Sequence, residues 1–192
     1  MKDVFSLYEH TEIPKGDTYL KSYPYLIEYF EGLDQITFGD AVRGAHMVYG
    51  WMPTMLRMGR GFKNGDDSEL AIKALNSVKR RDQLADEELK SVMAFTNNSI
   101  VGASKLLHFI SPDQYPIWDS RIYEFVHGKA PHGYQVNHLG RYLEYKALIH
   151  ELERKPACDL LHRSMSEKVG DKISRVRALE LVMFLNVGAS RQ

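Results

Sequence analysis

The chain has 192 residues, of which 44% are apolar, and its 25 basic and 25 acidic side chains cancel to a net charge of zero. This length and composition predict one globular domain spanning residues 1–192, and the zero net charge argues against a strong general affinity for nucleic acid. The single cysteine, Cys158, cannot form an internal disulfide or supply a thiolate metal cluster, and the eight histidines are scattered without a metal-ligand spacing. We expect neither a metal nor a cofactor.

No apolar run in the sequence reaches the roughly 18 residues that a membrane-spanning helix needs. The first 17 residues, MKDVFSLYEHTEIPKGD, also lack the basic and then apolar pattern of a secretory signal. We therefore expect a cytoplasmic protein that makes no contact with a membrane.

Apolar residues recur at three- and four-residue spacing in nearly every segment, and strictly alternating β-branched runs are missing. This pattern predicts an all-α fold. In chain order, we expect helices over residues 18–32, with Pro24 as a kink or break, 37–58, 68–81, 86–96, 99–110, 120–127, 137–153, 157–169 and 171–187. Glycine-rich and polar segments predict loops at 59–67 and 128–133.

The stretch 57–81 is unusually basic, with seven basic and three acidic side chains. Its candidate contacts to nucleic-acid phosphates are Arg57, Arg60, Lys63, Arg80 and Arg81. Two other interpretations stay open. The basic side chains can pair with acidic ones on neighbouring helices, and the cluster Lys79–Arg81 can complement the negative end of its own helix dipole.

Arg177 and Glu180 lie three residues apart in the last predicted helix, on a side that they share with Ile173 and Phe184. Opposite charges at this spacing are neighbours on a helix surface. We expect both to be partly buried and paired with each other, in a structural role.

Lys105 lies on a predicted helix whose other residues are mostly apolar. At 100° per residue, Ser104, Lys105 and His108 share one narrow polar stripe on that helix. If the stripe faces a cleft, partial loss of water lowers the pKa of a lysine and makes its neutral amine available as a nucleophile. If the stripe faces bulk water, Lys105 is an ordinary surface lysine.

Asp119 is placed to begin the next predicted helix, fourteen residues after Lys105. As an N-cap residue, it would accept hydrogen bonds from backbone amides and stay ionised. It could still present an oxygen to a positive charge that develops in a cleft. Trp118 packs in the core or lines a pocket wall where a planar base would stack. The candidate substrate contacts are Trp51, His108, Trp118 and Arg121.

The order of a lysine-bearing helix, a loop with prolines and a Pro-Ile-Trp-Asp helix start resembles the helix-hairpin-helix DNA glycosylase superfamily, and more closely its bacterial 8-oxoguanine-glycosylase-like members. The resemblance covers residues 86–127 and, more vaguely, 173–186. It implies a compact multi-helix glycosylase fold in which Lys105 attacks the sugar C1′ carbon and Asp119 assists, after a damaged base has been flipped from the duplex. The hairpin of that superfamily normally carries two glycines, and the corresponding turn here, Asn97 to Gly102, carries one.

These residues favour a DNA glycosylase or lyase that acts on damaged or modified bases through a lysine nucleophile, with DNA as its partner. The alternative is a non-catalytic helical module on the same scaffold that binds another protein, which the zero net charge favours. A third interpretation is a small-molecule enzyme or binding protein that uses the region of Trp51 and Trp118.

Overall fold

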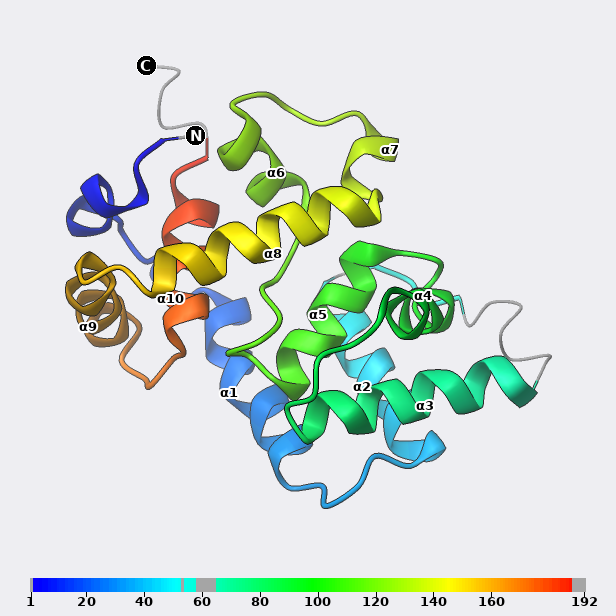
Figure 1. Ribbon diagram of the computed structural model, residues 1–192. Helices are drawn as coiled ribbons and strands as arrows, with labels where there is room; N and C mark the ends of the chain where they lie inside the picture. The colour runs from blue at the N-terminus through cyan, green and yellow to red at the C-terminus, as the bar shows by residue number, and fades with distance from the viewer. Residues whose placement is uncertain (1, 53, 58–64, 188–192) are drawn as a thin grey trace. The chain divides into compact units, whose positions relative to one another are not determined.

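All regular structure that can be assigned in this protein is helical (Figure 1). The computed structural model describes residues 2–52, 54–57 and 65–187, except for the side chains of 65–67. The prediction of an all-α fold is confirmed. Within the described ranges, no helix is both long and apolar enough to cross a membrane.

The chain divides into two compact units. Unit 2 is the continuous stretch Thr18–Gln114, and unit 1 combines Met1–Asp17 with Tyr115–Gln192. The helices of unit 2 are α1 (Thr18–Glu31), α2 (Phe38–Trp51), α3 (Gly65–Lys79), α4 (Asp86–Phe95) and α5 (Ile100–Ile110). Unit 1 holds the short 3-10 helices η1 (Val4–Ser6) and η2 (Tyr8–His10), and then α6 (Ser120–His127), α7 (Gly133–Val136), α8 (Leu139–Glu153), α9 (Ala157–Val169) and α10 (Arg175–Leu185). The single domain over residues 1–192 stays a prediction.

The helix ends differ from the predicted ones at a few places. Pro24 lies inside α1 and does not break it, because the buried side chains of Tyr23, Leu26 and Phe30 hold the helix on both sides of the proline. Helix α2 ends at Trp51 rather than at residue 58. The predicted loop 59–67 begins outside the described residues, and its last three residues belong to α3.

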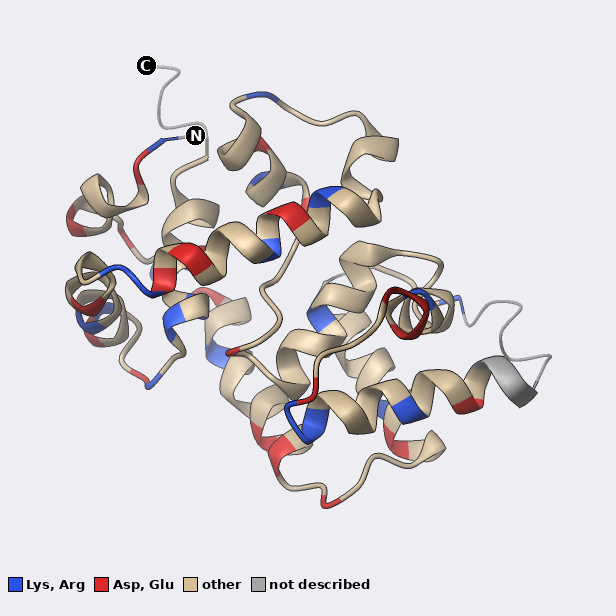
Figure 2. Ribbon diagram, in the orientation of Figure 1, with Lys and Arg blue, Asp and Glu red and all other residues tan. Residues whose placement is uncertain are grey.

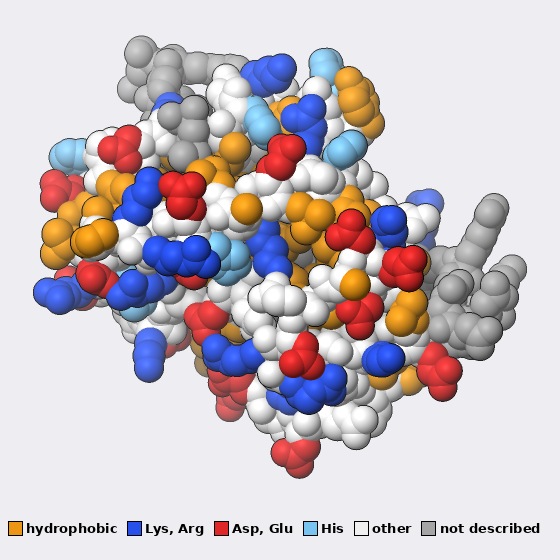
Figure 3. All heavy atoms as spheres, in the orientation of Figure 1, with side chains coloured by type: hydrophobic (Ala, Val, Ile, Leu, Met, Phe, Trp, Pro, Cys, Tyr) orange, Lys and Arg blue, Asp and Glu red, His pale blue; other side chains and the backbone are white. Residues whose placement is uncertain are grey.

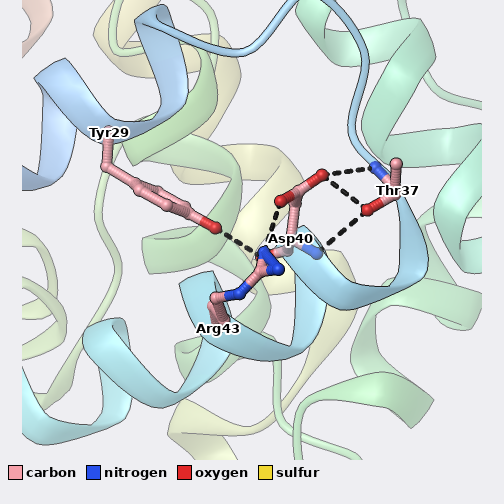
Figure 4. Close-up of polar contacts among 4 residues, drawn as sticks. All are labelled: Tyr29, Thr37, Asp40 and Arg43. Atoms are coloured by element: carbon pink, nitrogen blue, oxygen red, sulfur yellow. Dashed lines mark hydrogen bonds and ion pairs between the residues drawn. The ribbon is translucent and has the colours of Figure 1, made fainter.

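The start of α2 is fixed by a reciprocal capping box (Figure 4). The Thr37 hydroxyl accepts a hydrogen bond from the Asp40 amide at 3.2 Å, and the Asp40 carboxylate accepts one from the Thr37 amide at 3.0 Å. Hydrogen bonds from Thr37, followed by those from the Arg43 guanidinium, hold the pKa of Asp40 below its ordinary value. The Tyr29 hydroxyl donates to the backbone oxygen of Asp40, which ties α1 to this cap.

Helix α5 is the centre of unit 2, where it packs against α1, α2, α3 and α4. Nine of its eleven residues are buried, so it is surrounded by protein on nearly every side. A helix that is buried all round must be apolar all round or must find partners for its polar groups. The surroundings of Lys105 and His108 therefore follow from the position of α5.

The turn between α4 and α5 takes its shape from two asparagines. Asn97 and Asn98 have φ of 60° and 53°, a left-handed conformation that asparagine tolerates better than most residues. The Asn97 side chain also accepts from the Arg57 amide at 2.7 Å and donates to the Met55 backbone oxygen at 3.0 Å. The two asparagines thus supply left-handed turn residues in a hairpin that has one glycine.

That glycine, Gly102, is required by packing inside unit 2. A Cβ atom built at Gly102 would overlap the Tyr49 hydroxyl and lie 3.0 Å from its Cζ. The same hydroxyl donates a hydrogen bond to the Thr96 backbone oxygen at 2.8 Å, at the end of α4, and burial raises the pKa of Tyr49 to about 12. The hydrogen bond from Tyr49 to the end of α4 therefore requires that residue 102 has no side chain.

In unit 1, α10 takes the central position and packs against α6, α8 and α9. The amino-terminal segment joins this unit through Lys168 on α9. Its ammonium donates to the backbone oxygens of Tyr8, Glu9 and Thr11 at 2.7, 2.8 and 3.0 Å. One lysine thus satisfies three carbonyl groups of the segment.

We predict that Gly102→Ala lowers the free energy of unfolding by about 1–3 kcal/mol, because the new methyl group forces Tyr49 to move and overpacks a buried contact. Thermal or urea unfolding, followed by circular dichroism, measures this change. Gly50→Ala is the matched control: a Cβ at Gly50 meets no atom within 4 Å, and alanine is the better helix former. Equal or greater stability of Gly102→Ala would contradict the packing argument.

Candidate active site

Lys105 is buried within unit 2, with 9% of its surface exposed. Its Nζ atom lies 5.8 Å from the centroid of the Trp51 ring, within the range of a cation–π contact. The Trp51 ring meets Phe109 edge-on, with the centroids 5.2 Å apart, and its Nε1 donates to the Tyr19 backbone oxygen at 3.1 Å. The stripe of α5 that carries Lys105 therefore does not face bulk water.

His108, one turn further along α5, is fully buried. Its Nε2 atom lies 2.8 Å from the Tyr23 hydroxyl, at hydrogen-bonding distance. A phenol and an imidazole in contact can pass a proton between them, with the direction set by the histidine tautomer. We name Tyr23, Trp51, Lys105, His108 and Phe109 the α5 cluster.

The α5 cluster brings together three of the residues that the sequence singled out, Trp51, Lys105 and His108. It adds Tyr23 of α1, for which the sequence indicates no functional role. A tyrosine among the apolar residues of a helix carries a hydroxyl that needs a hydrogen-bond partner once it is buried. This need was the one feature of the sequence that could have indicated a polar contact for Tyr23. The cluster holds an amine largely out of water beside an aromatic face.

Asp119 lies in unit 1, at the start of α6, and its predicted role as N-cap is confirmed. Its Oδ1 accepts from the amides of Arg121 and Ile122 at 2.9 and 3.0 Å. Arg121 is tied to the end of α10: its Nε donates to the Phe184 backbone oxygen at 3.0 Å, and its guanidinium lies 4.4 Å from the Phe184 ring centroid. The carboxylate is therefore held rigidly at a helix start.

Trp118 is fully buried in unit 1 and serves as a core residue. Its Nε1 donates to the Val136 backbone oxygen at 2.8 Å, and its ring packs against Tyr145 with the centroids 5.0 Å apart. Of the two roles left open for this tryptophan, the structure favours core packing. The partnership of Lys105 in unit 2 with Asp119 in unit 1 stays a prediction.

A buried polar group, Glu180, fixes the segment that leads into Asp119. Glu180 on α10 is 1% exposed and accepts a short hydrogen bond from the Ile117 amide. Its other oxygen pairs with the Arg177 guanidinium at 3.4 Å, so the predicted burial and pairing are confirmed. Burial raises the pKa of Glu180 to about 8, against the opposing effects of Arg177 and the Ile117 amide.

Two tyrosines of α8 lie near this carboxyl group. The hydroxyls of Tyr142 and Tyr145 are buried and have no hydrogen-bond partner among the described residues. Burial, with a smaller contribution from the charge of Glu180, raises the pKa of both phenols well above 10. No sequence pattern marks this group, because tyrosines three residues apart on a helix are indistinguishable from ordinary core residues.

The basic residues of 57–81 are only partly described. Arg57 is exposed, whereas Arg60 and Lys63 lie outside the described residues. Arg80 pairs with Asp82, and Arg81 pairs with Asp113, each at 3.2 Å. These are exposed ion pairs of the kind that contribute little stability, and they favour charge pairing as the role of Arg80 and Arg81.

We predict that Glu180→Gln gains stability relative to the wild type as the pH rises from about 5 to about 8. The pKa of Glu180 is about 8 in the folded protein, against 4.5 for an ordinary glutamate, so the folded state binds the extra proton between these values. The contribution of Glu180 to wild-type stability is therefore present at low pH and is lost as the pH rises. Glutamine cannot ionise and escapes this loss.

Melting temperatures of the two proteins between pH 4.5 and 8.5 measure the effect. Glu144→Gln is the matched control, because Glu144 is an exposed glutamate of α8. Its melting temperature relative to the wild type gives, at each pH, the baseline for the loss of an exposed carboxyl group. A constant difference for Glu180→Gln would show that Glu180 titrates as an ordinary carboxyl group.

No protein-family model, curated protein or solved structure gives a match to this chain. The resemblance to the helix-hairpin-helix DNA glycosylase superfamily accordingly rests on the helix of Lys105, the loop with prolines and the helix start at Asp119, and it stays a prediction. Lys105 and Asp119 are the two residues that this resemblance singles out for catalysis.

Proposed function

We propose that this protein is a DNA glycosylase or lyase whose nucleophile is the amine of Lys105. The main support is the position of that amine in the α5 cluster, beside the Trp51 ring and with little access to water. A lysine in such a setting can form a covalent imine with a sugar carbon, because its amine is not held in the hydrated state of a surface lysine.

The proposed reaction begins with attack of the neutral Nζ of Lys105 on the C1′ carbon of a deoxyribose. The N–C1′ bond forms as the glycosidic bond breaks, and the base leaves with the electron pair and takes up the proton that the attacking nitrogen releases. The sugar ring then opens, with O4′ taking up a proton, and a positively charged imine remains between Lys105 and C1′.

Three further groups have roles in this proposal. The resemblance to the glycosylase superfamily gives Asp119 the role of steadying the positive charge of the imine. The pair formed by His108 and Tyr23 would carry a proton within the α5 cluster, and the Trp51 ring would offer an apolar face to a planar base.

Borohydride trapping tests the proposal directly. Duplexes carrying 8-oxoguanine, uracil or an abasic site are incubated with the protein and borohydride, and adducts are resolved by denaturing electrophoresis. We expect an adduct with the wild type that is absent with Lys105→Met, since methionine fills the space of the lysine stem without an amine. Asp119→Asn should form it at least tenfold more slowly, because asparagine keeps the helix cap and removes the charge.

Lys146→Ala is the matched control for the amine. Lys146 lies in unit 1 with its Nζ 4.0 Å from the Tyr115 ring centroid, and burial lowers its pKa, so it is a second amine in an aromatic setting. Loss of the adduct in Lys146→Ala but not in Lys105→Met would assign the nucleophile to Lys146. Absence of any adduct on all duplexes would reject the proposal and favour the non-catalytic module.

A further inference from the structure

Residues 125–143 form an acid-free segment that joins α6 to α8 and includes α7. Glu124 and Glu144 flank it, and between them the chain has no aspartate or glutamate. Figure 2 shows the ribbon without acidic colour from the end of α6 to the start of α8. Its basic side chains are His127, Lys129, His132, His138 and Arg141. The segment therefore carries two permanent positive charges, Lys129 and Arg141, and no negative one, in a chain whose net charge is zero.

The acid-free segment also presents an aromatic face to solvent. Tyr134 is 75% exposed, and its ring is nearly parallel to that of His132, at 6° with the centroids 6.2 Å apart. Lys129, His132 and His138 are exposed as well. Figure 3 shows histidine, lysine or arginine, and hydrophobic side chains side by side at the surface of this region.

This exposed face is anchored in the core of unit 1. Val136, two residues after Tyr134, is buried, and its backbone oxygen accepts the hydrogen bond from Trp118. The His132 amide donates to the Gln135 side chain at 3.0 Å, which closes the turn of α7. Tyr134 is thus held outward on a fixed turn, so that stacking on its ring requires little further ordering of the backbone.

Arg141 stands at the other end of the segment and is positioned by an aromatic neighbour. Its Nη1 lies 3.4 Å from the Tyr123 hydroxyl, and its guanidinium lies 5.6 Å from the Tyr123 ring centroid. The ring of His127 packs against the same tyrosine, with its centroid 4.2 Å from that of Tyr123. These contacts hold a cation in place at the surface.

We propose that the acid-free segment is a nucleic-acid contact surface, in which Lys129 and Arg141 bind phosphates and Tyr134 stacks on an unpaired base. Alternating cationic and aromatic side chains are the combination that binds single strands without sequence preference. The occupant is a DNA strand with an unpaired base, since an exposed ring offers nothing to a base inside a duplex. The choice of DNA rests on the proposed function.

Fluorescence anisotropy with a labelled oligothymidine and with a duplex of the same length tests the proposal at several salt concentrations. We expect the wild type to bind the single strand more tightly. Tyr134→Ala should weaken this binding about tenfold, which is the loss of one stacked base. Lys129→Ala should reduce the slope of log affinity against log salt by about 0.7, which is the loss of one phosphate contact.

Matched controls separate the segment from general surface effects. Tyr25→Ala removes a tyrosine that is 69% exposed in unit 2, and Lys155→Ala removes an exposed lysine just beyond α8. Neither should change the affinity more than twofold. Equal affinities of Tyr134→Ala and Tyr25→Ala would overturn the proposal. So would binding to a polyglutamate peptide or to phosphatidylserine vesicles that is as tight as binding to DNA.

The experiments distinguish an error in the proposed surface from an error in the proposed function, because anisotropy measures binding alone and borohydride trapping measures a covalent reaction. Binding that depends on Tyr134 together with no borohydride adduct would reject the enzyme and keep the surface. If Tyr134→Ala forms the borohydride adduct at the wild-type rate and binds the oligothymidine with the wild-type affinity, the enzyme is kept and the surface is rejected. Lys105→Met should bind the oligothymidine as the wild type does.

Discussion

The burial of α5 is the constraint on which the candidate site depends. Because this helix packs against four others, every polar group on it must either find a partner or bear the full free-energy cost of leaving water. His108 meets the Tyr23 hydroxyl, and Lys105 lies beside the Trp51 ring. The chemistry proposed for Lys105 therefore depends on packing: the contacts that place α5 at the centre of unit 2 also remove its amine from bulk solvent.

Unit 1 solves the same problem differently. Its central helix, α10, carries a buried arginine in contact with a buried glutamic acid, Arg177 and Glu180, where α5 carries a lysine and a histidine. Glu180 bonds to the extended backbone before α6 and so holds the residues that lead into Asp119. A buried polar pair of this kind is weak as a source of stability. Its role here is to fix where the segment before α6 meets α10.

The sequence predicted most of the helices because their apolar residues repeat at helical spacing, but it could not predict features that depend on tertiary contacts. Pro24 signalled a break, and packing on both sides of it preserved the helix. The turn before α5 carries one glycine where the superfamily that it resembles carries two, and Asn97 and Asn98 adopt the left-handed conformation themselves. For the site, the sequence allowed the polar stripe of Lys105 to face either a cleft or bulk water, and burial excludes bulk water. The contact of Tyr23 with His108 joins residues 85 positions apart, so no local pattern in the sequence could predict it.

Unit 1 is discontinuous in sequence, because unit 2 is inserted between its amino-terminal segment and its helices α6 to α10. Lys168 joins the amino-terminal segment to α9. During synthesis, residues 18–114 form a continuous stretch whose contacts are all available once α5 has emerged. The segment around Tyr8 must wait for α9, about 160 residues later in the chain. Unit 2 can therefore fold first, and its folding shortens the distance over which the amino-terminal segment must search for its partner.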